Sequence, residues 1–389
     1  MNVPKLRFKE FTDEWKIIKL DELYEFKNGI NADRTAYGKG VPLISVTDII
    51  NNNFITYNKI RGKIDISNNI LMNNSVEYGD ILFQRSSETF VEIGTSNIYL
   101  DNKMVTFGGF VIRGKKKNNE IPLFINYELK SPNSRKKIII KGAGAQHYNI
   151  GQEDLKQVSI FIPSKEEQTK IANFLSLLDK KIELQTKKIE DLKLYKLSLR
   201  EKLFNMFETE EKTLSRILVK WNKKNKDNEY SYVESVSNRF GFIAQNEQFD
   251  DRNIASSNTN NYYVIEKGVF AYNPSRLNVG SLALKKDDNI SLVSPLYECF
   301  TTNQNKDFLL EWFQSKEFKK GTFSKFEGGV RNTLNFTNLS TIKISLPNIE
   351  SQNRIANILN RYNKLVELEN KKLYLLQDLK KGFMQKMFV

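Results

Sequence analysis

The sequence predicts an α+β protein built as two tandem mixed domains, each followed by a long helix, with the two helices pairing as an antiparallel coiled coil. Three observations predict this architecture. Residues 163–204 align without a gap with residues 347–388. Both segments carry apolar residues at heptad spacing, which is typical of a coiled-coil seam. The block before each segment contains short alternating apolar runs, which are typical of strands.

The repeat sets the predicted boundaries along the chain. They are residues 1–162 for the first domain, 163–205 for the first helix, 206–346 for the second domain and 347–389 for the second helix. A lysine-rich run at the start of the second domain reads as a solvated linker: Lys220, Lys223, Lys224 and Lys226. An alternating apolar run leads into each helix and predicts a short strand there. These runs are Val158, Ile160 and Ile162 before Pro163, and Ile342, Ile344 and Leu346 before Pro347.

Each repeated segment has a proline in its first turn and, apart from Gly382, no glycine or proline within it, so both are predicted to be helical throughout. About 40 residues at a rise of 1.5 Å form a rod of roughly 60 Å. The predicted seam is Ile171, Leu175, Leu178, Ile182, Ile189, Leu192, Leu199 and Leu203 in the first helix, and Ile355, Leu359, Tyr362, Val366, Leu373, Leu376, Phe383 and Met387 in the second.

Two seam positions are polar in both copies, Gln185 with Glu369 and Lys196 with Lys380. An antiparallel pair centred on the repeat would place Lys196 opposite Glu369 and Gln185 opposite Lys380. The alternative is that each helix packs on its own domain or on another subunit.

The composition favours a polyanionic partner. Lysine and arginine number 60 against 46 acidic residues, a formal charge of +14, which suits nucleic acid or an anionic membrane surface. A protein that is basic without such a partner is the alternative. No apolar run approaches the roughly 20 residues of a membrane-spanning helix. One cysteine, Cys299, and one histidine, His147, leave little for a disulfide framework or a zinc site. We therefore expect a cytoplasmic protein without a metal of its own.

Two motifs carry a resemblance to a known family. The start of the first helix reads Pro-x-x-x-Glu-Gln-x-x-Ile-Ala-x-x-Leu over residues 163–175, and the chain opens with PKLRFKEFTDEWKIIKLDELYEFKNG at 4–29. Both resemble the DNA-specificity (S) subunits of type I restriction-modification systems. The second copy departs from the pattern, because Ser351 precedes Gln352 and residues 205–232 lack a full PKLRF-type opening.

The resemblance covers essentially the whole chain and implies a non-catalytic subunit with two target-recognition domains. An antiparallel spacer would hold two different readers on one duplex, so the target would be two half-sites separated by an unread gap. The implied partners are double-stranded DNA, two modification (methyltransferase) subunits and, in the full complex, restriction (motor-nuclease) subunits. Those partners would use S-adenosylmethionine, ATP and Mg²⁺, and this chain would hold no cofactor. The implied subunit-docking and spacer positions on the helices are Gln168, Ile171, Ala172, Leu175, Gln352, Ile355, Ala356 and Leu359.

Candidate DNA contacts are basic and amide side chains in each domain. In the first domain they are Arg85, Lys115, Lys116, Lys117, Arg135, Lys136, Lys137, Lys141, Gln146 and His147. In the second they are Asn273, Arg276, Lys319, Lys320, Lys325, Arg331 and Asn332. Arginine pairs with guanine and asparagine or glutamine with adenine, so the stronger base-reading candidates are Arg85, Gln146, Asn273, Arg276 and Arg331. Ordinary surface charge is the alternative for the lysines, and a structural role is the alternative for His147.

Catalytic motifs are missing from the sequence. It contains no G-x-x-x-x-G-K-[ST] phosphate loop. The run Asn273-Pro274-Ser275-Arg276 lacks the second proline and the aromatic residue of adenine methyltransferases. Two other functions remain open: a coiled-coil scaffold or adaptor without sequence-specific DNA binding, and a solitary methyltransferase or nuclease.

Overall fold

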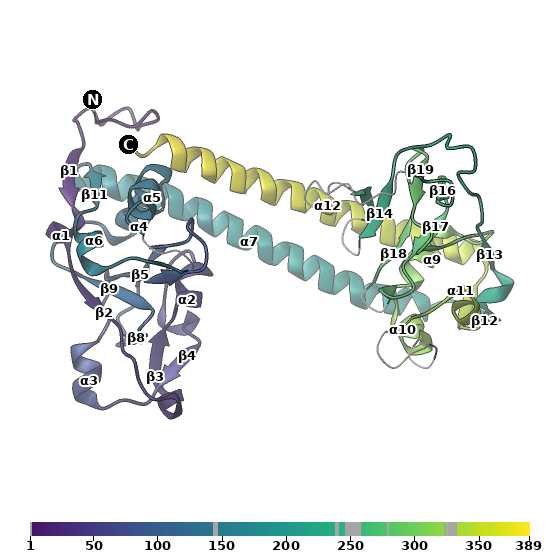
Figure 1. Ribbon diagram of the computed structural model, residues 1–389, viewed down its shortest axis with the longest axis horizontal. Helices are drawn as coiled ribbons and strands as arrows, with labels where there is room; N and C mark the ends of the chain where they lie inside the picture. The colour runs from purple at the N-terminus through teal and green to yellow at the C-terminus, as the bar shows by residue number, and fades with distance from the viewer. Residues whose placement is uncertain are drawn as a thin grey trace. The chain divides into compact units, whose positions relative to one another are not determined.

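The computed structural model of the chain describes residues 2–142, 147–237, 241–245, 258–277, 280–322, 325 and 333–389. These residues form two compact units. The first contains Met1–Thr186 and Lys371–Val389, and the second contains Lys187–Asn370. Two long helices, α7 (Lys165–Phe204) and α12 (Ile349–Lys386), each contribute one end to each unit (Figure 1). The first unit is therefore made of two separate stretches of the chain, whereas the second is one continuous stretch.

The first unit is built on a four-stranded antiparallel sheet of order β2-β9-β5-β7, with Phe26, Gly114 and Ile81 in register across it. Beside it lies a three-stranded sheet, β4-β3-β8, in which β3 and β8 run parallel. The strands are β1 Lys16–Lys19, β2 Tyr24–Asn28, β3 Tyr37–Ile44, β4 Gly62–Ile64, β5 Ile81–Gln84, β6 Ser86–Ser87, β7 Ser96–Ile98, β8 Thr106–Phe107, β9 Val111–Lys116, β10 Tyr148–Asn149 and β11 Ser159–Ile162. The short helices are α1 Leu20–Leu23, η1 Arg34–Ala36, α2 Val46–Ile50, η2 Tyr57–Lys59, α3 Asn68–Asn73, α4 Pro122–Lys130, α5 Pro132–Ile139 and α6 Gln152–Lys156.

The second unit repeats the central sheet as β13-β20-β17-β18, again antiparallel. Its described strands are β12 Thr209–Thr213, β13 Leu218–Lys220, β14 Glu234–Ser237, β15 Gly241–Ala244, β16 Tyr263–Ile265, β17 Phe270–Tyr272, β18 Leu282–Leu284, β19 Ser291–Val293, β20 Glu298–Thr302 and β21 Lys343–Pro347. Its short helices are η3 Leu214–Arg216, α9 Lys306–Trp312, α10 Lys316–Thr322 and α11 Phe336–Ser340.

The strands predicted before the long helices are present in both units. Strand β11 pairs antiparallel with β1, and β21 pairs antiparallel with β12. The alternating residues Ile160 and Ile344 are fully buried, as the period-two pattern requires. The start of the second domain thus matches the start of the first one: a strand on the edge of this pair, a short helical turn, and then the outer strand of the central sheet.

The prediction of a linker over the lysine-rich run at the start of the second domain is wrong. Lys220 lies in β13 and pairs with Phe300 of β20. Lys223 forms an ion pair with Glu266, and Lys224 donates to the carbonyl of Asn261 at 2.8 Å. Lys220, Lys223 and Lys226 are exposed, as a solvated run requires, and Lys224 is half-buried. The segment is nevertheless part of the folded second unit and not a connector.

The helices pair antiparallel in each unit, as predicted. In the first unit the rings of Phe174 and Phe383 pack edge to face at 4.8 Å. In the second, Tyr195 stacks on Tyr362 at 5.6 Å, and Lys188 donates to Glu369 at 2.5 Å. The predicted seam residues are buried or half-buried throughout.

The predicted register is wrong by about two helical turns. Glu369 lies opposite Lys188 instead of Lys196, and Lys380 pairs with Asp179 at 2.5 Å instead of facing Gln185. Burial of the helix ends explains the shift. Met384, Met387 and Phe388 enter the core of the first unit, and Leu199, Leu203 and Phe204 pack in the core of the second. Each buried apolar side chain is worth about 1.5–3 kcal/mol, more than an exposed ion pair at about 0–1 kcal/mol.

Candidate nucleic-acid interface

Arg85 follows β5 and lines a cavity of about 570 Å³ in the first unit. Its backbone is fixed by two hydrogen bonds, from Arg85 N to the carbonyl of Phe110 and from Ile150 N to the carbonyl of Arg85. Its guanidinium makes one long contact with the carbonyl of Gly109, at 3.5 Å. The cavity is lined by Asn28, Arg85, Asn149, Ile150, Gly151, Gln152, Glu153 and Asp154. An arginine and three amides around one hollow are the groups that read base edges.

Aromatic side chains lie next to this cavity. Phe110 is 69% exposed, and its carbonyl holds the backbone of Arg85. Phe90, also exposed, packs on Tyr148 with the rings 5.2 Å apart. We call Arg85, Phe90, Phe110, Tyr148 and Asn149 the Arg85 patch. Apolar rings beside arginine can contact bases and insert at a base step. The sequence reasoning missed both phenylalanines, although the Gly108-Gly109-Phe110 turn was a usable signal, because glycines around one large apolar residue indicate an exposed loop.

The lysines at the other end of β9 lie away from the Arg85 patch, because the strand runs from Val111 to Lys116. Lys115 pairs with Glu77 at 3.2 Å, and Lys117 donates to the carbonyl of Asp21 at 2.7 Å. Lys116 is half-buried, and its backbone N–H donates to Asp80. These three side chains therefore form a separate surface from the Arg85 patch.

The basic residues of α5, and Lys141 just after it, are largely bonded within the fold. Arg135 donates to the carbonyls of Val91 and Ile93, both at 2.9 Å, and its burial lowers its pKa to about 10. It thereby holds the loop that carries Phe90. Lys137 donates to the carbonyl of Ser159, and Lys141 donates to Gln157 at 2.8 Å. Lys136 is exposed on the same helix, and His147 is exposed beside Tyr148.

In the second unit the turn after β17 takes the place that Arg85 occupies after β5. Asn273 accepts a hydrogen bond from Ser275 N at 3.0 Å, and Arg276 extends from the same turn with an exposed side chain. Lys319 and Lys320 are exposed on α10, and Lys325 is half-buried. The predicted contacts Gln146, Arg331 and Asn332 lie outside the described residues.

The helix positions given a docking or spacer role are buried inside each unit, so their side chains are not available for contact with another subunit. Gln168, Ile171, Ala172 and Leu175 are at most 2% exposed, and Gln352, Ile355, Ala356 and Leu359 at most 3%. Each glutamine makes the same three hydrogen bonds, which we call the glutamine clasp. Gln168 accepts from Ile121 N and donates to Pro163 O and Glu120; Gln352 accepts from Asn305 N and donates to Pro347 O and Gln304. The motif therefore fastens each long helix to its own domain.

Other apolar side chains on the helices are exposed. In the first unit these are Leu177, Leu184, Tyr374, Leu375 and Leu379. In the second they are Leu194, Tyr195, Leu197, Ile358, Leu365 and Leu368. Two pairs occupy matching positions of the repeat, Leu184 with Leu368 and Tyr195 with Leu379. An apolar stripe of this kind is typical of a protein-docking surface.

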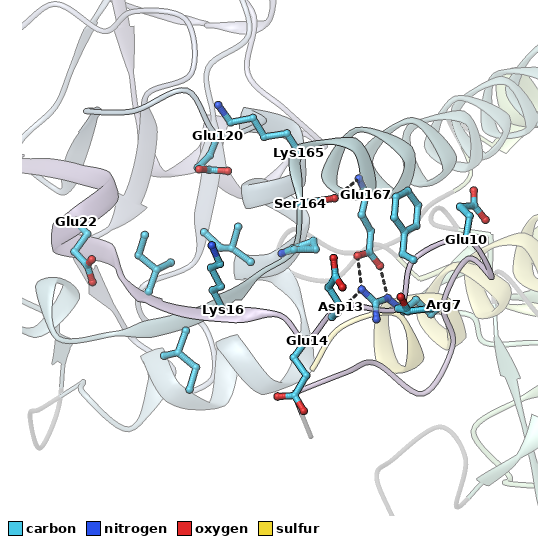
Figure 2. Close-up of a pocket in the computed structure, with 16 residues that line it drawn as sticks. Arg7, Glu10, Asp13, Glu14, Lys16, Glu22, Glu120, Ser164, Lys165 and Glu167 are labelled. Carbon is cyan, nitrogen blue, oxygen red and sulfur yellow. Dashed lines mark hydrogen bonds and ion pairs between the residues drawn. The ribbon is translucent and has the colours of Figure 1, made fainter.

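A second hollow, of about 560 Å³, lies where the N-terminal segment meets the start of α7. Figure 2 shows Arg7 reaching Glu167, with which it forms an ion pair at 2.7 Å. The lining also carries Glu10, Asp13, Glu14, Glu22 and Glu120. With Glu167, the carboxylates outnumber the three basic side chains of the lining, Arg7, Lys16 and Lys165, so this hollow repels phosphate and does not suit DNA.

Among the described residues, no group of three or more histidine, cysteine, aspartate or glutamate side chains could hold a metal ion. Within the same part of the chain, no helix has the length and apolar character needed to cross a membrane.

Known proteins share this architecture. A family model described as the type I restriction modification DNA specificity domain matches residues 12–194 and again residues 205–377. A putative type I restriction enzyme specificity subunit, MjaX, from Methanocaldococcus jannaschii is 24% identical over 412 residues, covering 98% of this chain and 95% of that one. The solved S subunit from M. genitalium is similar with a TM-score of 0.58 at 17% identity, covering 100% and 99% of the two chains. A chain from a study of type I R-M complex assembly gives a TM-score of 0.56 at 12% identity, covering 95% and 96%.

Proposed function

The chain belongs to the family of type I restriction-modification DNA specificity subunits, and we propose that each of its units reads one half-site of a split DNA target. The role of the family is DNA target specificity, and its partners are DNA and the subunits of a restriction-modification complex. Our proposal concerns the surface that reads the bases, the difference between the half-sites and the number of docked subunits.

One observation carries the proposal. Each unit has its own central sheet with the same strand order, but the side chains after the corresponding strand differ. The order β2-β9-β5-β7 is repeated as β13-β20-β17-β18. After β5 the chain presents Arg85, whereas after β17 it presents the turn Asn273 to Arg276. A common scaffold with different hydrogen-bonding groups at one edge suits two readers of different sequences.

The Arg85 patch is the proposed reader of the first half-site. The guanidinium of Arg85 can donate two parallel hydrogen bonds to guanine. Asn149 lies beside it, with its amide held by Ser86 and by the carbonyl of His147. In the second half-site Arg276 is the corresponding base reader. Lys136, Lys319 and Lys320, which are exposed, suit phosphate contacts.

The exposed helix stripe is the proposed docking surface for modification subunits. The matching exposure of Leu184 with Leu368, and of Tyr195 with Leu379, supports two equivalent docking positions and therefore two modification subunits. Methyl transfer and cleavage, with S-adenosylmethionine, ATP and Mg²⁺, would then belong to the partner subunits, and this chain would be non-catalytic.

The test is to co-express the chain with its cognate modification subunit and map adenine methylation across the host genome. We expect a two-part motif with an unspecified gap that appears only when this chain is present. Replacing residues 1–160 with those of a relative should change one half of the motif and leave the other. Scattered or absent methylation from a stable complex would contradict the reading role and favour a scaffold. Methyl transfer by the purified chain alone would favour a solitary enzyme.

A further inference from the structure

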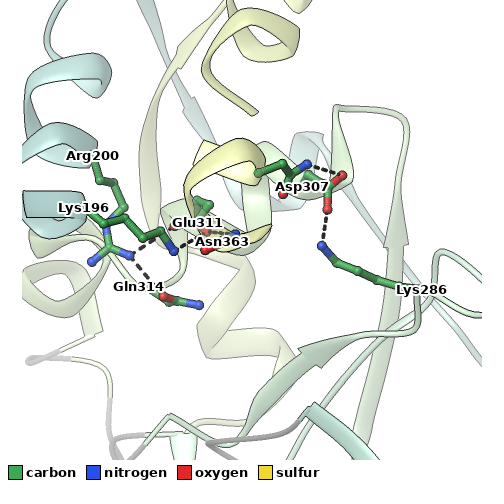
Figure 3. A network of polar contacts seen from close by, with 8 residues as sticks. Lys196, Arg200, Lys286, Asp307, Glu311, Gln314 and Asn363 are labelled. Atoms are coloured by element: carbon green, nitrogen blue, oxygen red, sulfur yellow. Dashed lines mark hydrogen bonds and ion pairs between the residues drawn. The ribbon is translucent and has the colours of Figure 1, made fainter. Parts of the chain in front are cut away.

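The seam lysines Lys196 and Lys380 occupy matching positions of the repeat, but their surroundings differ. In the second unit Glu311 of α9 accepts hydrogen bonds from Lys196 at 2.7 Å and from Asn363 at 2.9 Å. Arg200, one turn further along α7, also donates to Glu311, at 3.3 Å, and to Gln314 at 3.0 Å (Figure 3). One carboxylate from the globular part therefore balances two cations from the helix.

In the first unit the carboxylate comes from the helix. Asp179 of α7 receives Lys380 at 2.5 Å and the hydroxyl of Tyr127 at 2.7 Å. The repeat places Tyr127 where the second unit has Glu311, and Asp179 where it has Asn363. Both sites thus have a lysine at the matching position of the repeat. Its carboxylate partner lies on α9 in the second unit and on α7 in the first.

The position of Arg200 differs most between the units. Arg200 is only 3% exposed, and its charge is met by Glu311. The matching position on α12 holds Met384, which is 9% exposed and packs in the apolar core of the first unit together with Tyr127. Lys130 stands where the second unit has Gln314. Burial, and then the charge of Lys380, lower the pKa of Lys130 to about 7, so this corner already disfavours another cation.

We propose that Arg200 and Glu311 decide which helices pair, and we call them the pairing selector. They direct the C-terminal end of α7 to α9 of the second unit and exclude it from the corresponding position beside α4 of the first unit. If the α7 of a second copy took the place of α12 in the first unit, its Lys196 would occupy the position of Lys380 and pair with Asp179. Its Arg200 would then be buried where Tyr127 replaces the second unit's carboxylate, with Asp179 already paired and Lys130 close by. Breaking a buried pair in this way disfavours the arrangement by on the order of a hundredfold. The two different halves of one chain therefore pair with each other, and two identical first halves do not. The inference is independent of which bases are read and of DNA binding itself.

The first experiment refolds the full chain from denaturant at high concentration and measures the dimer fraction by light scattering after gel filtration. Wild type should refold with few dimers. R200M removes the cation that disfavours pairing of two first halves, so its dimer fraction should rise about tenfold. R200K keeps the charge and is the matched control, with few dimers expected. A dimer fraction for R200M equal to that of wild type, or equal to that of R200K, would overturn the proposal. An ion pair that only stabilised the second unit would lower the melting temperature without this split.

The second experiment transfers the selector to the other unit. M384R places a guanidinium in the core of the first unit, and hydrogen–deuterium exchange of residues 122–130 should speed up at least tenfold, while residues 306–314 stay protected. Adding Y127E should restore protection, and Y127Q should not. If M384R fails to fold, recovery of soluble folded protein in M384R/Y127E but not in M384R/Y127Q gives the same answer. Normal protection in M384R alone, or equal recovery with Y127Q, would contradict the selector.

Discussion

The two units repeat the same central sheet, and they differ in the turn after its central strand and in the site that buries the end of a long helix. The glutamine clasp is the same in both, with Gln168 accepting from Ile121 N at 3.0 Å and Gln352 accepting from Asn305 N at 3.0 Å. The polar contacts of Lys196 differ from those of Lys380. The turn after β17 also has a different sequence from the turn after β5. The glutamine clasp is thus the same in the two units. The units differ in the turns proposed to read bases, after β5 and β17, and in the contacts of Lys196 and Lys380.

The largest expected effect comes from removing the shared acid of the second unit. E311Q leaves Lys196 and Arg200 buried without their carboxylate, and unfolding of the second unit should become easier by about 3 kcal/mol. Urea denaturation followed by hydrogen exchange of residues 306–314 measures this. E211Q, which removes an exposed partner of Lys343, is the control and should cost at most about 0.5 kcal/mol. Equal effects of the two substitutions would show that the buried site contributes no more than a surface pair.

Removing the glutamine clasp should lower the stability of the two units by similar amounts. Q168A and Q352A each leave a buried backbone N–H and a carbonyl without partners, and each should destabilise its unit by about 1–3 kcal/mol. Thermal melting of the two variants gives the comparison. A loss confined to one of them would mean that the repeated hydrogen bonds have different energetic weight in the two units.

Substituting the proposed base-reading arginine of one unit should change only the half-site that this unit reads. R85A should relax one base position in the first half-site, with a loss of about 1–3 kcal/mol of discrimination, and R276A should do the same in the second. Methylation mapping in cells that contain the modification subunit measures both. K117A, whose ammonium bonds to the carbonyl of Asp21, should leave the motif unchanged. A change in both halves from either arginine variant would contradict one reader per half-site.

The smallest expected effect is a pH dependence confined to the first unit. Burial raises the pKa of Glu128 to about 8, although Ser134 and Phe161 N donate to the carboxyl group. The repeat places Trp312 at the matching position of the second unit. Because the folded state holds the proton more tightly, the stability from this group is full below about pH 4.5 and is lost as the pH rises to about 8.

E128Q should therefore flatten the fall in stability of the first unit between those pH values and leave the second unit unaffected. Denaturation at several pH values, with hydrogen exchange of each unit, measures the slope. A slope that persists in E128Q would assign the pH dependence to another group.

Much of the fold could be predicted because it rests on local pattern. The heptad spacing gave both long helices and their seam, and the alternating runs gave β11 and β21. The antiparallel direction was predicted as well, but the polar pairs expected with it, Lys196 with Glu369 and Gln185 with Lys380, are replaced by Lys188 with Glu369 and Asp179 with Lys380. The site was predicted less well. Arg85 and Arg276 lie on comparable turns, but Arg135, Lys137 and Lys141 turned out to bond within the fold, and Phe90 and Phe110 were missed.

The sequence by itself determined the duplication, the helices and the family, because periodicity and repeated motifs are properties of residue order alone. Tertiary structure decided the helix register, the burial of the motif residues and the partners of the basic side chains. The register depends on how much apolar surface Met384, Met387 and Phe388 bury in a core assembled from distant segments. The partner of a lysine or arginine is in turn a carboxylate or carbonyl that only folding brings within reach, as Arg200 and Glu311 show.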